Sequence, residues 1–190
     1  PSIQMAAASR QKEVGRDAMM SELEALVGTA TLSPTDAHRI TANLFERIFT
    51  TSCDSLMNEA VATTGHTVLG PTEPLIDGPM LVNLRGTFAT APIVTSDDWV
   101  PFDEAQNTEM RRLIRSNVVL FVGYRPDEEE FELVFEQLTA AYRAELPRCH
   151  LAVAQGRIED YQWQRWVWRG LLLFTADPSE CMNALEAKLK

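Results

Sequence analysis

Two arginines lie where a predicted strand gives way to a turn, and their side chains are suited to binding a small anion. Arg85 precedes Gly86, and Arg125 follows Gly123 by two positions. A guanidinium can bind a phosphate through two parallel hydrogen bonds, so either arginine could hold a nucleotide phosphate. The alternative is an ion pair with a neighbouring carboxylate, which the 27 acidic residues of the chain make easy. We expect the ion pairs.

The acidic run at residues 127–130 could be a metal-binding cluster. It opens a predicted helix, however, and acidic side chains in a first helical turn interact favourably with the helix dipole. We therefore interpret the run as a solvated helix start. Its carboxylates would repel the phosphates of a dinucleotide bound nearby.

The cysteines and histidines are too scattered to indicate a metal site or a disulfide framework. No two cysteines have the C-x-x-C spacing, and no histidine is at a metal-ligand spacing from another ligand. We expect reduced thiols, no bound metal, and structural positions for all six residues. These residues are Cys53, Cys149, Cys181, His38, His66 and His150.

Three tryptophans interleaved with arginines form the most aromatic segment of the chain. Helical spacing puts Trp163 and Trp166 on one face of the helix and Trp168 on a different side. At least one of the three rings is therefore hard to bury if a single face of the helix packs on the core. We expect core packing for most of the group. Tryptophan beside arginine is also the composition of a protein-binding hot spot, and of a surface on which nucleic-acid bases stack.

Short apolar strands alternate with amphipathic helices, most regularly after residue 117. This order is typical of a parallel sheet covered on both faces. We predict an α/β fold with a Rossmann-like, doubly wound, mostly parallel sheet and helices on both faces. The predicted helices are 11–27, 33–44, 54–65, 107–115, 127–146, 158–168 and 178–190, and the predicted strands are 47–51, 66–69, 80–84, 92–95, 118–122, 151–154 and 171–174.

The prediction for domain organisation is one domain over residues 1–190, with a helical N-terminal segment at 1–38 and a core at 39–190. Ligands of open α/β sheets bind beyond the carboxyl ends of the strands, where the next helix begins. Three such turns, at 50–54, 83–86 and 121–127, contain polar residues and glycines. The predicted binding residues there are Thr51, Ser52, Asp54, Arg85, Gly123, Tyr124 and Arg125.

In order and spacing, these three turns resemble motifs of the sirtuin-like (silent information regulator-like) family of NAD-handling domains. The turn at 50–54 is similar to the family's Thr-Thr-Asn-Tyr-Asp, the turn at 83–86 to its Leu-His-Gly, and the turn at 121–127 to its Gly-Tyr-Ser-x-x-Asp. The resemblance extends over residues 39–189. It implies a Rossmann-like fold, and NAD or ADP-ribose as the ligand if the domain binds one.

The positions that do chemistry in this family are changed in this chain. Ser52 replaces the asparagine that positions the ribose and the attacking water, and Arg125 replaces a serine that donates to the cofactor. Arg85 replaces the histidine that acts as general base, and an arginine stays protonated near neutral pH. Nothing before Arg39 matches the family's Gly-Ala-Gly-x-Ser loop, whose backbone amides hold the pyrophosphate.

From these departures we predict a catalytically degenerate domain that needs no cofactor and acts as a structural, regulatory or protein-interaction subunit. The resemblance implies oligomers, with a protein partner or further copies of the chain, and a prokaryotic antiviral defence complex as one setting. One alternative is an NAD hydrolase completed by sequence upstream of Pro1 or by a neighbouring protomer. Another is a nucleotide sensor that binds through Arg85 or Arg125 without turnover.

The composition of the chain indicates where the protein resides and which classes of partner it can bind. A net charge of −10 argues against nonspecific binding to nucleic acid, because phosphate contacts need a cationic face. No apolar run reaches the length of a membrane span, and residues 1–11 lack the pattern of a signal peptide. We expect a cytoplasmic protein with no membrane partner.

Overall fold

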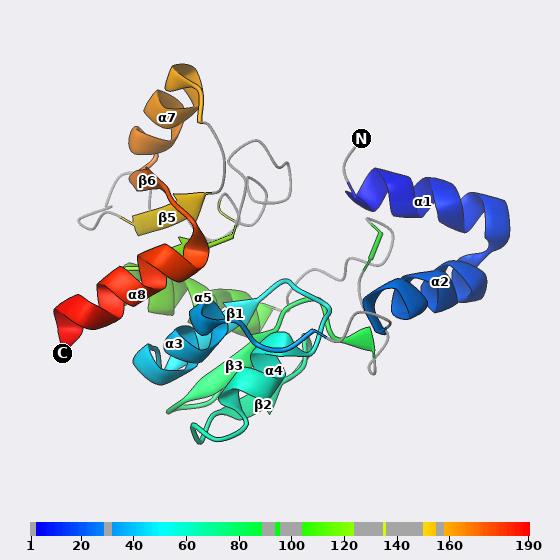
Figure 1. Cartoon of the computed structure of the whole chain (residues 1–190), viewed down its shortest axis with the longest axis horizontal. Coiled ribbons are helices and arrows are strands. Elements are labelled where there is room, and N and C mark those ends of the chain that lie inside the picture. The colour runs from blue at the N-terminus through cyan, green and yellow to red at the C-terminus, as the bar shows by residue number, and fades with distance from the viewer. Residues whose placement is uncertain are drawn as a thin grey trace. The chain divides into compact units, whose positions relative to one another are not determined.

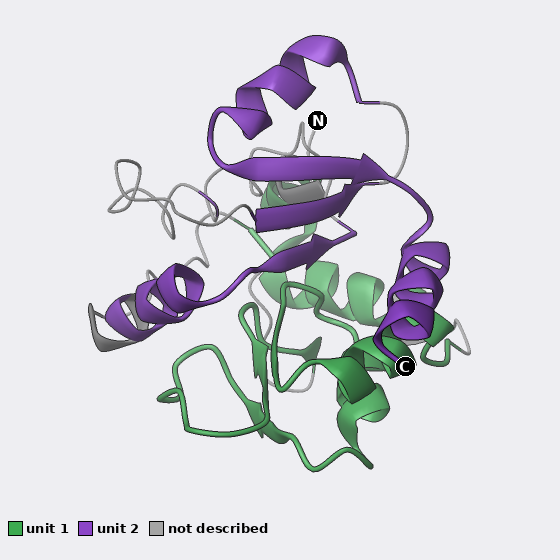
Figure 2. Ribbon diagram, turned by 90° about the vertical axis from the view of Figure 1, so that its left-hand side faces the viewer, with its two compact units in different colours: residues 1–102 green, residues 103–190 purple. Residues whose placement is uncertain are grey.

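The computed structural model of the chain describes residues 3–28, 32–88, 94–95, 104–123, 135, 150–154 and 158–190 (Figure 1). The chain divides into two compact units, 1–102 and 103–190, which we call the first and the second unit (Figure 2). Each unit is described by itself. The single domain proposed from the sequence stays a prediction.

The first unit begins with two helices, α1 (Ile3–Val14) and α2 (Arg16–Gly28), where the sequence predicts one helix over 11–27. That prediction is wrong because Gly15 separates the helices with a φ of 84°, a left-handed conformation that only glycine adopts readily. The hydrophobic spacing alone carries no sign of this break.

An ion pair joins α1 to α2 on their exposed surface. Two nitrogens of Arg10 donate to the carboxylate of Glu22, at 2.7 and 2.9 Å. Hydrogen bonding to Arg10 lowers the pKa of the Glu22 carboxyl, and the pKa of Arg10 is raised by the same contact. Exposed pairs of this kind contribute little to stability, so the pair mainly fixes how the two helices meet.

The rest of the first unit is a three-stranded parallel sheet with the order β1-β3-β2. Its central strand is buried at all four positions, three of them apolar (Met80, Leu81 and Val82) and the last one Asn83. The core lies between helices and sheet, and consists of Ala42, Ile48, Met57, Val61 and Leu81. The elements are α3 (Asp36–Leu44), β1 (Arg47–Thr50), α4 (Leu56–Val61), β2 (Thr67–Leu69) and β3 (Met80–Asn83).

The start of α3 differs from the one predicted at Ser33-Pro34. Its N-cap is Thr35, whose hydroxyl lies 2.7 Å from Nδ1 of His38, and the backbone N–H of Thr35 donates to the same nitrogen at 3.3 Å. A histidine can thus take the part that glutamate or glutamine usually plays in a capping box, which the sequence pattern did not indicate.

The second unit contains another three-stranded parallel sheet, with the order β4-β5-β6. Trp166 of α7 lies at the centre of its core, and its ring meets that of Phe135 edge to face, with centroids 5.3 Å apart. The core consists of Phe121, Phe135, Ala152, Trp166, Leu171 and Leu173. The elements are α5 (Glu104–Ser116), β4 (Leu120–Val122), β5 (His150–Ala154), α7 (Asp160–Val167), β6 (Leu171–Thr175) and α8 (Pro178–Leu189).

The residues at the start of the last helix, α8, determine where that helix begins. The carboxylate of Asp177 accepts from the backbone N–H groups of Ser179 at 2.8 Å and Glu180 at 3.3 Å, and Pro178 fills the first helical position. This arrangement satisfies two free N–H groups of the first turn, and it places α8 where the sequence predicts it.

Two parallel sheets flanked by helices confirm the predicted α/β, Rossmann-like class. The predicted helix at 127–146 lies outside the described residues except for Phe135, which is helical. Of the predicted strand at 92–95 only Val94 and Thr95 are described, and neither is in a strand. Among the helices that the structure describes, none has the length and apolar character needed to cross a membrane.

Candidate functional site

The carboxyl ends of β1 and β3 bring two of the three predicted turns together in the first unit. Thr50 pairs with Asn83 in the parallel register, and the backbone N–H of Leu84 donates to the Thr50 carbonyl at 2.9 Å. Beyond the strands, the N–H of Phe88 donates to the Cys53 carbonyl at 3.3 Å. The turn with Thr51, Ser52 and Asp54 and the turn with Arg85 therefore line one edge of the sheet.

Asp54 is engaged by the chain around it. One carboxylate oxygen accepts from the hydroxyl of Ser52 at 2.5 Å, and the other accepts from the backbone N–H of Leu56 at 2.9 Å. Asp54 thus binds a backbone N–H group at the start of α4, which begins at Leu56 with Ser55 in the N-cap position. Ser52 in turn receives support from Thr50, whose side chain accepts from the Ser52 N–H at 3.1 Å.

Arg85 is half-buried, and its Nε and Nη2 atoms are shielded from solvent. A tight turn positions it: the N–H of Gly86 donates to the Asn83 carbonyl at 3.0 Å, and Gly86 has a φ of 69°. Glycine is needed there because a side chain is strained in this left-handed region. The turn holds a permanent positive charge at the end of the central strand.

Asn83 is the functional candidate that sequence reasoning missed. It is 4% exposed, and its amide oxygen is buried without a hydrogen-bond partner. Leaving a buried acceptor unsatisfied costs free energy, so such groups call for an explanation. The available signal was the polar residue that closes the apolar strand Met-Leu-Val-Asn, at the edge where ligands bind.

The third predicted turn belongs to the second unit and is described there by itself. Gly123 ends β4 with a φ of 83°, and its N–H donates to the carbonyl of Val153 at 3.2 Å. A Cβ atom added at Gly123 would meet no atom of the described residues within 4 Å, so the positive φ is what favours glycine there. Tyr124 and Arg125 lie outside the described residues, as does the acidic run at 127–130.

The aromatic segment corrects the expectation that most of its tryptophans are core. Trp166 is 0% exposed, whereas Trp163 is exposed and Trp168 is 88% exposed. The guanidinium carbons of Arg165 and Arg169 lie 5.9 and 5.1 Å from the Trp166 ring centre. The Trp166 ring anchors α7 in the core of the second unit. Trp168 lies well round the helix from Trp166, whereas Trp163 shares the face of Trp166 and is exposed all the same.

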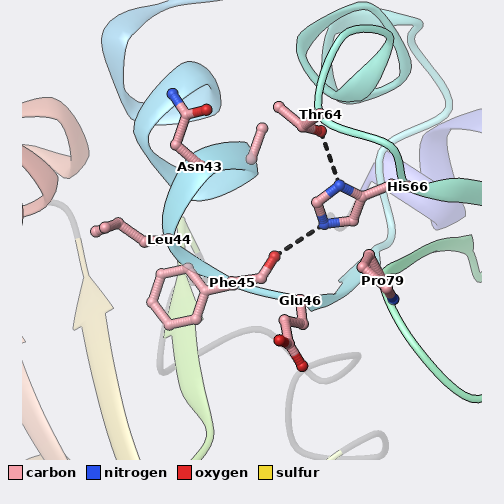
Figure 3. A pocket seen from close by; sticks show the side chains of 8 residues that line it. Asn43, Leu44, Phe45, Glu46, Thr64, His66 and Pro79 are labelled. Carbon is pink, nitrogen blue, oxygen red and sulfur yellow. Dashed lines mark hydrogen bonds between the residues drawn. The ribbon is translucent and has the colours of Figure 1, made fainter.

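A hollow of about 260 Å³ lies at the amino end of the first sheet (Figure 3). Within it, Nε2 of His66 lies 2.9 Å from the Phe45 carbonyl, and Nδ1 lies 2.7 Å from the Thr64 hydroxyl (Figure 3). Both ring nitrogens are thus engaged in joining the end of α3 to the turn before β2. Ligands of such sheets bind at the opposite edge, so we interpret His66 as structural.

His150, at the start of β5, is a buried histidine of the second unit. Its Nδ1 accepts from the backbone N–H of Val119 at 3.2 Å, while its Nε2 is buried without a hydrogen-bond partner. Burial lowers the pKa of His150, which keeps the imidazole neutral. The burial of His150 agrees with the structural position expected for it.

The residues at the β1–β3 edge fit part of what NAD would need. Arg85 suits a phosphate, and the buried acceptor of Asn83 suits a hydroxyl or amide donor. Proton abstraction is a different demand, because Arg85 cannot accept a proton near neutral pH. For metals, no cluster of three or more histidine, cysteine, aspartate or glutamate residues occurs within the described part of the chain.

Comparison with known families gives one match. The family model described as SIR2-like domain matches residues 46–171, which is more than half of the chain. The matched stretch runs from the residue before β1 to the first residue of β6, and contains all seven predicted binding residues. A search of curated proteins found no match to this chain.

Proposed function

The chain belongs to the SIR2-like domain family, and from that premise we propose that it is a family member that does not cleave NAD and acts as a protein-interaction subunit of a larger assembly. The observation that carries the proposal is Arg85 at the end of the central strand. The resemblance assigns this position to the general base, and a guanidinium cannot take a proton from a ribose hydroxyl near neutral pH.

The neighbouring turn supports the same proposal. Ser52 stands in place of the family's asparagine, and its hydroxyl donates to Asp54 at 2.5 Å. Asp54 also accepts from the N–H of Leu56. Both polar side chains therefore stabilise the turn and the start of α4, which is a structural use of Ser52 at the position where the resemblance places the ribose-positioning asparagine.

Nicotinamide release tests the proposal. The purified chain is incubated with NAD beside an active NAD-cleaving enzyme, and nicotinamide is measured by chromatography. We expect no release above the rate in buffer alone. Release that depends on the folded chain, and that is lost in Asp54→Ala but kept in Asn43→Leu at the opposite edge of the sheet, would overturn the proposal.

A nucleotide sensor that binds without turnover is the second candidate, and Asn83 is the observation that favours it. Its buried amide oxygen, unbonded in the first unit, is an acceptor beside the positive charge of Arg85. A ribose hydroxyl or a base amino group would satisfy the oxygen, and a phosphate would meet the guanidinium.

Thermal unfolding in the presence of NAD, ADP-ribose or AMP separates the two candidates. A ligand at about 100 times its dissociation constant stabilises the folded state by about 2.7 kcal/mol. The sensor requires such a shift in the wild type, its loss in Asn83→Leu, and its retention in Asn43→Leu. The protein-interaction proposal expects no shift with any of the three nucleotides.

For the setting, we propose a prokaryotic antiviral defence complex, on the strength of the family resemblance. Purifying the protein with its native neighbours and identifying what remains bound tests this extension. A chain that elutes alone at native concentration argues against a heteromeric complex.

A further inference from the structure

His66 is part of a chain of three side-chain hydrogen bonds that joins the end of α3 to the end of α4. Its Nε2 lies 2.9 Å from the carbonyl oxygen of Phe45, the residue that caps α3 at its carboxyl end (Figure 3). Its Nδ1 lies 2.7 Å from the hydroxyl oxygen of Thr64. That hydroxyl donates to the carbonyl of Val61, the last residue of α4, at 3.0 Å. One imidazole ring therefore connects two helices of the first unit.

The number of hydrogens on the ring decides whether all three bonds can form together. A carbonyl oxygen only accepts, so Nε2 of His66 must carry a hydrogen to bond Phe45. The Thr64 hydroxyl has a single hydrogen, which is directed to the Val61 carbonyl. Its oxygen can then meet Nδ1 only as an acceptor, so Nδ1 must carry a hydrogen as well. A ring with hydrogens on both nitrogens is the imidazolium cation.

The neutral ring makes one hydrogen bond fewer. When Nδ1 has no hydrogen, the Thr64 hydroxyl must turn toward that nitrogen, and it leaves the Val61 carbonyl. The carbonyl keeps the backbone N–H of Thr64, which donates to it at 3.0 Å. No buried acceptor is left unbonded, so the fold persists with a weaker connection. The loss of one hydrogen bond corresponds to about a two- to tenfold change in an equilibrium constant.

The charges around the ring also favour the cation. The side chain of Glu46 lines the same hollow as His66, and a carboxylate attracts an imidazolium (Figure 3). The Phe45 carbonyl belongs to the carboxyl end of α3, where the helix dipole is negative and a nearby positive charge is stabilised.

The other charged side chains of the neighbouring elements are engaged elsewhere or do not titrate in the same range. On α3, Asp36 pairs with Arg39 at 3.2 Å. On α4, Glu59 accepts from the hydroxyl of Ser55 at 2.5 Å. Arg47, the first residue of β1, keeps its charge throughout the range in which histidines titrate. A change of pH between acid and mildly alkaline therefore acts on this connection through the imidazole.

We propose that His66 is a proton-sensitive clasp, which fastens the end of α4 to the end of α3 when its ring is charged and loosens when the ring is neutral. Histidine is the side chain that ordinarily changes its charge between about pH 5 and about pH 8. The clasp acts on the helix whose other end follows the turn with Ser52 and Asp54. It is a property of the first unit that does not depend on whether the chain cleaves NAD.

His38, at the opposite end of α3, has the opposite requirement and supplies a matched control. Its Nδ1 accepts from the backbone N–H of Thr35 at 3.3 Å, which only a nitrogen without a hydrogen can do. Acid therefore removes the bond of His38, whereas acid completes the bonds of His66. The two histidines should stabilise the chain with opposite dependence on pH.

Urea unfolding of the whole chain at about pH 5.5 and about pH 8 tests the inference. The equilibrium constant of unfolding of each variant is divided by that of the wild type at the same pH, so that groups present in both chains, such as His150, cancel. His66→Gln keeps a donor for the Phe45 carbonyl and cannot become charged. We expect its ratio to be about two- to tenfold larger at the acid pH than at the alkaline pH.

Three further variants separate the clasp from other effects of pH. His38→Gln keeps a residue that suits this position of a capping box, and its ratio should not be larger at the acid pH. Thr64→Val should change in the same direction as His66→Gln, because it removes two hydrogen bonds from the charged state and one from the neutral state. Thr64→Ser keeps the hydroxyl, and its ratio should be the same at both pH values.

A ratio for His66→Gln that is equal at the two pH values, or larger at the alkaline one, overturns the inference. Should that variant fail to fold, the nitrogen-15 spectrum of labelled histidine in the wild type decides. The clasp requires the neutral ring of His66 to keep its hydrogen on Nε2 at about pH 8. A neutral ring with its hydrogen on Nδ1 would overturn the inference, because it could not donate to the Phe45 carbonyl.

Discussion

Folded proteins usually bury apolar side chains and expose polar ones. The edge of the first sheet and the end of α7 each contain one exception, and the two exceptions are of opposite kinds. In the first unit, Asn83 is a polar residue that is buried with its amide oxygen unbonded. In the second unit, Trp168 is a large apolar residue that is almost fully exposed. Buried polar groups and exposed apolar groups are the informative exceptions in a folded chain. The first lies at the edge where ligands of such sheets bind, and the second leaves a large ring in contact with solvent at the end of α7.

The largest effect is expected at the aromatic core of the second unit. Trp166→Ala removes a fully buried ring that packs edge to face on Phe135, and should lower the free energy of unfolding by about 3–5 kcal/mol. Trp168→Ala should change it by less than about 0.5 kcal/mol in the monomer. Urea denaturation followed by circular dichroism measures both. Equal losses would contradict the division of α7 into an anchoring face and a solvent face.

The next largest effect is expected from His150, the buried histidine of the second unit, which should make the free energy of unfolding depend on pH. Burial lowers the pKa of His150 in the folded state, so the unfolded chain binds more protons below about pH 6.5. Stability is therefore full above pH 6.5, and falls as the pH drops toward the folded pKa, by at most about 1.4 kcal/mol per pH unit. Denaturation midpoints at several pH values measure this slope.

His150→Asn is the control for that slope, because an amide oxygen can accept from the Val119 N–H without titrating. The variant should lose the part of the pH dependence that arises below pH 6.5. A slope that is unchanged in His150→Asn would show that other groups produce it.

A loss of stability smaller than that of Trp166→Ala is expected at the edge of the first sheet. Asp54→Ala removes the acceptor for the Leu56 N–H at the start of α4, and should lower the free energy of unfolding by about 1 kcal/mol. Asp54→Asn keeps an acceptor oxygen and should lose less. Thermal unfolding of the two variants compares them, and a greater loss in Asp54→Asn than in Asp54→Ala would contradict the capping role.

The sequence correctly predicted those helices and strands that are specified by their own residues. The Asp-Pro start of α8 and the apolar strand β3 are examples, since a capping carboxylate and a run of buried residues are visible in the chain itself. The break at Gly15 was missed, because a glycine inside a helical pattern does not by itself announce a left-handed turn. The capping of α3 by His38 was missed because it relies on an unusual residue for that position.

The candidate site was predictable only in part. The positions of Ser52, Asp54 and Arg85 followed from strand ends and from the family motifs, because parallel strands bring such turns to one edge. The unbonded oxygen of Asn83 was not predictable, since it depends on the packing around one side chain. Likewise, angular position alone did not reveal which tryptophans remain exposed, because that depends on how many neighbours cover α7.

Nicotinamide release measured over a range of chain concentrations tests the central claim most directly. It also examines the case in which a neighbouring protomer completes the site. Release is measured over a wide range of chain concentrations at a fixed NAD concentration. The account predicts no release above the rate in buffer at any chain concentration. Release that rises with the square of the chain concentration would contradict it, because that dependence requires catalysis by a paired species.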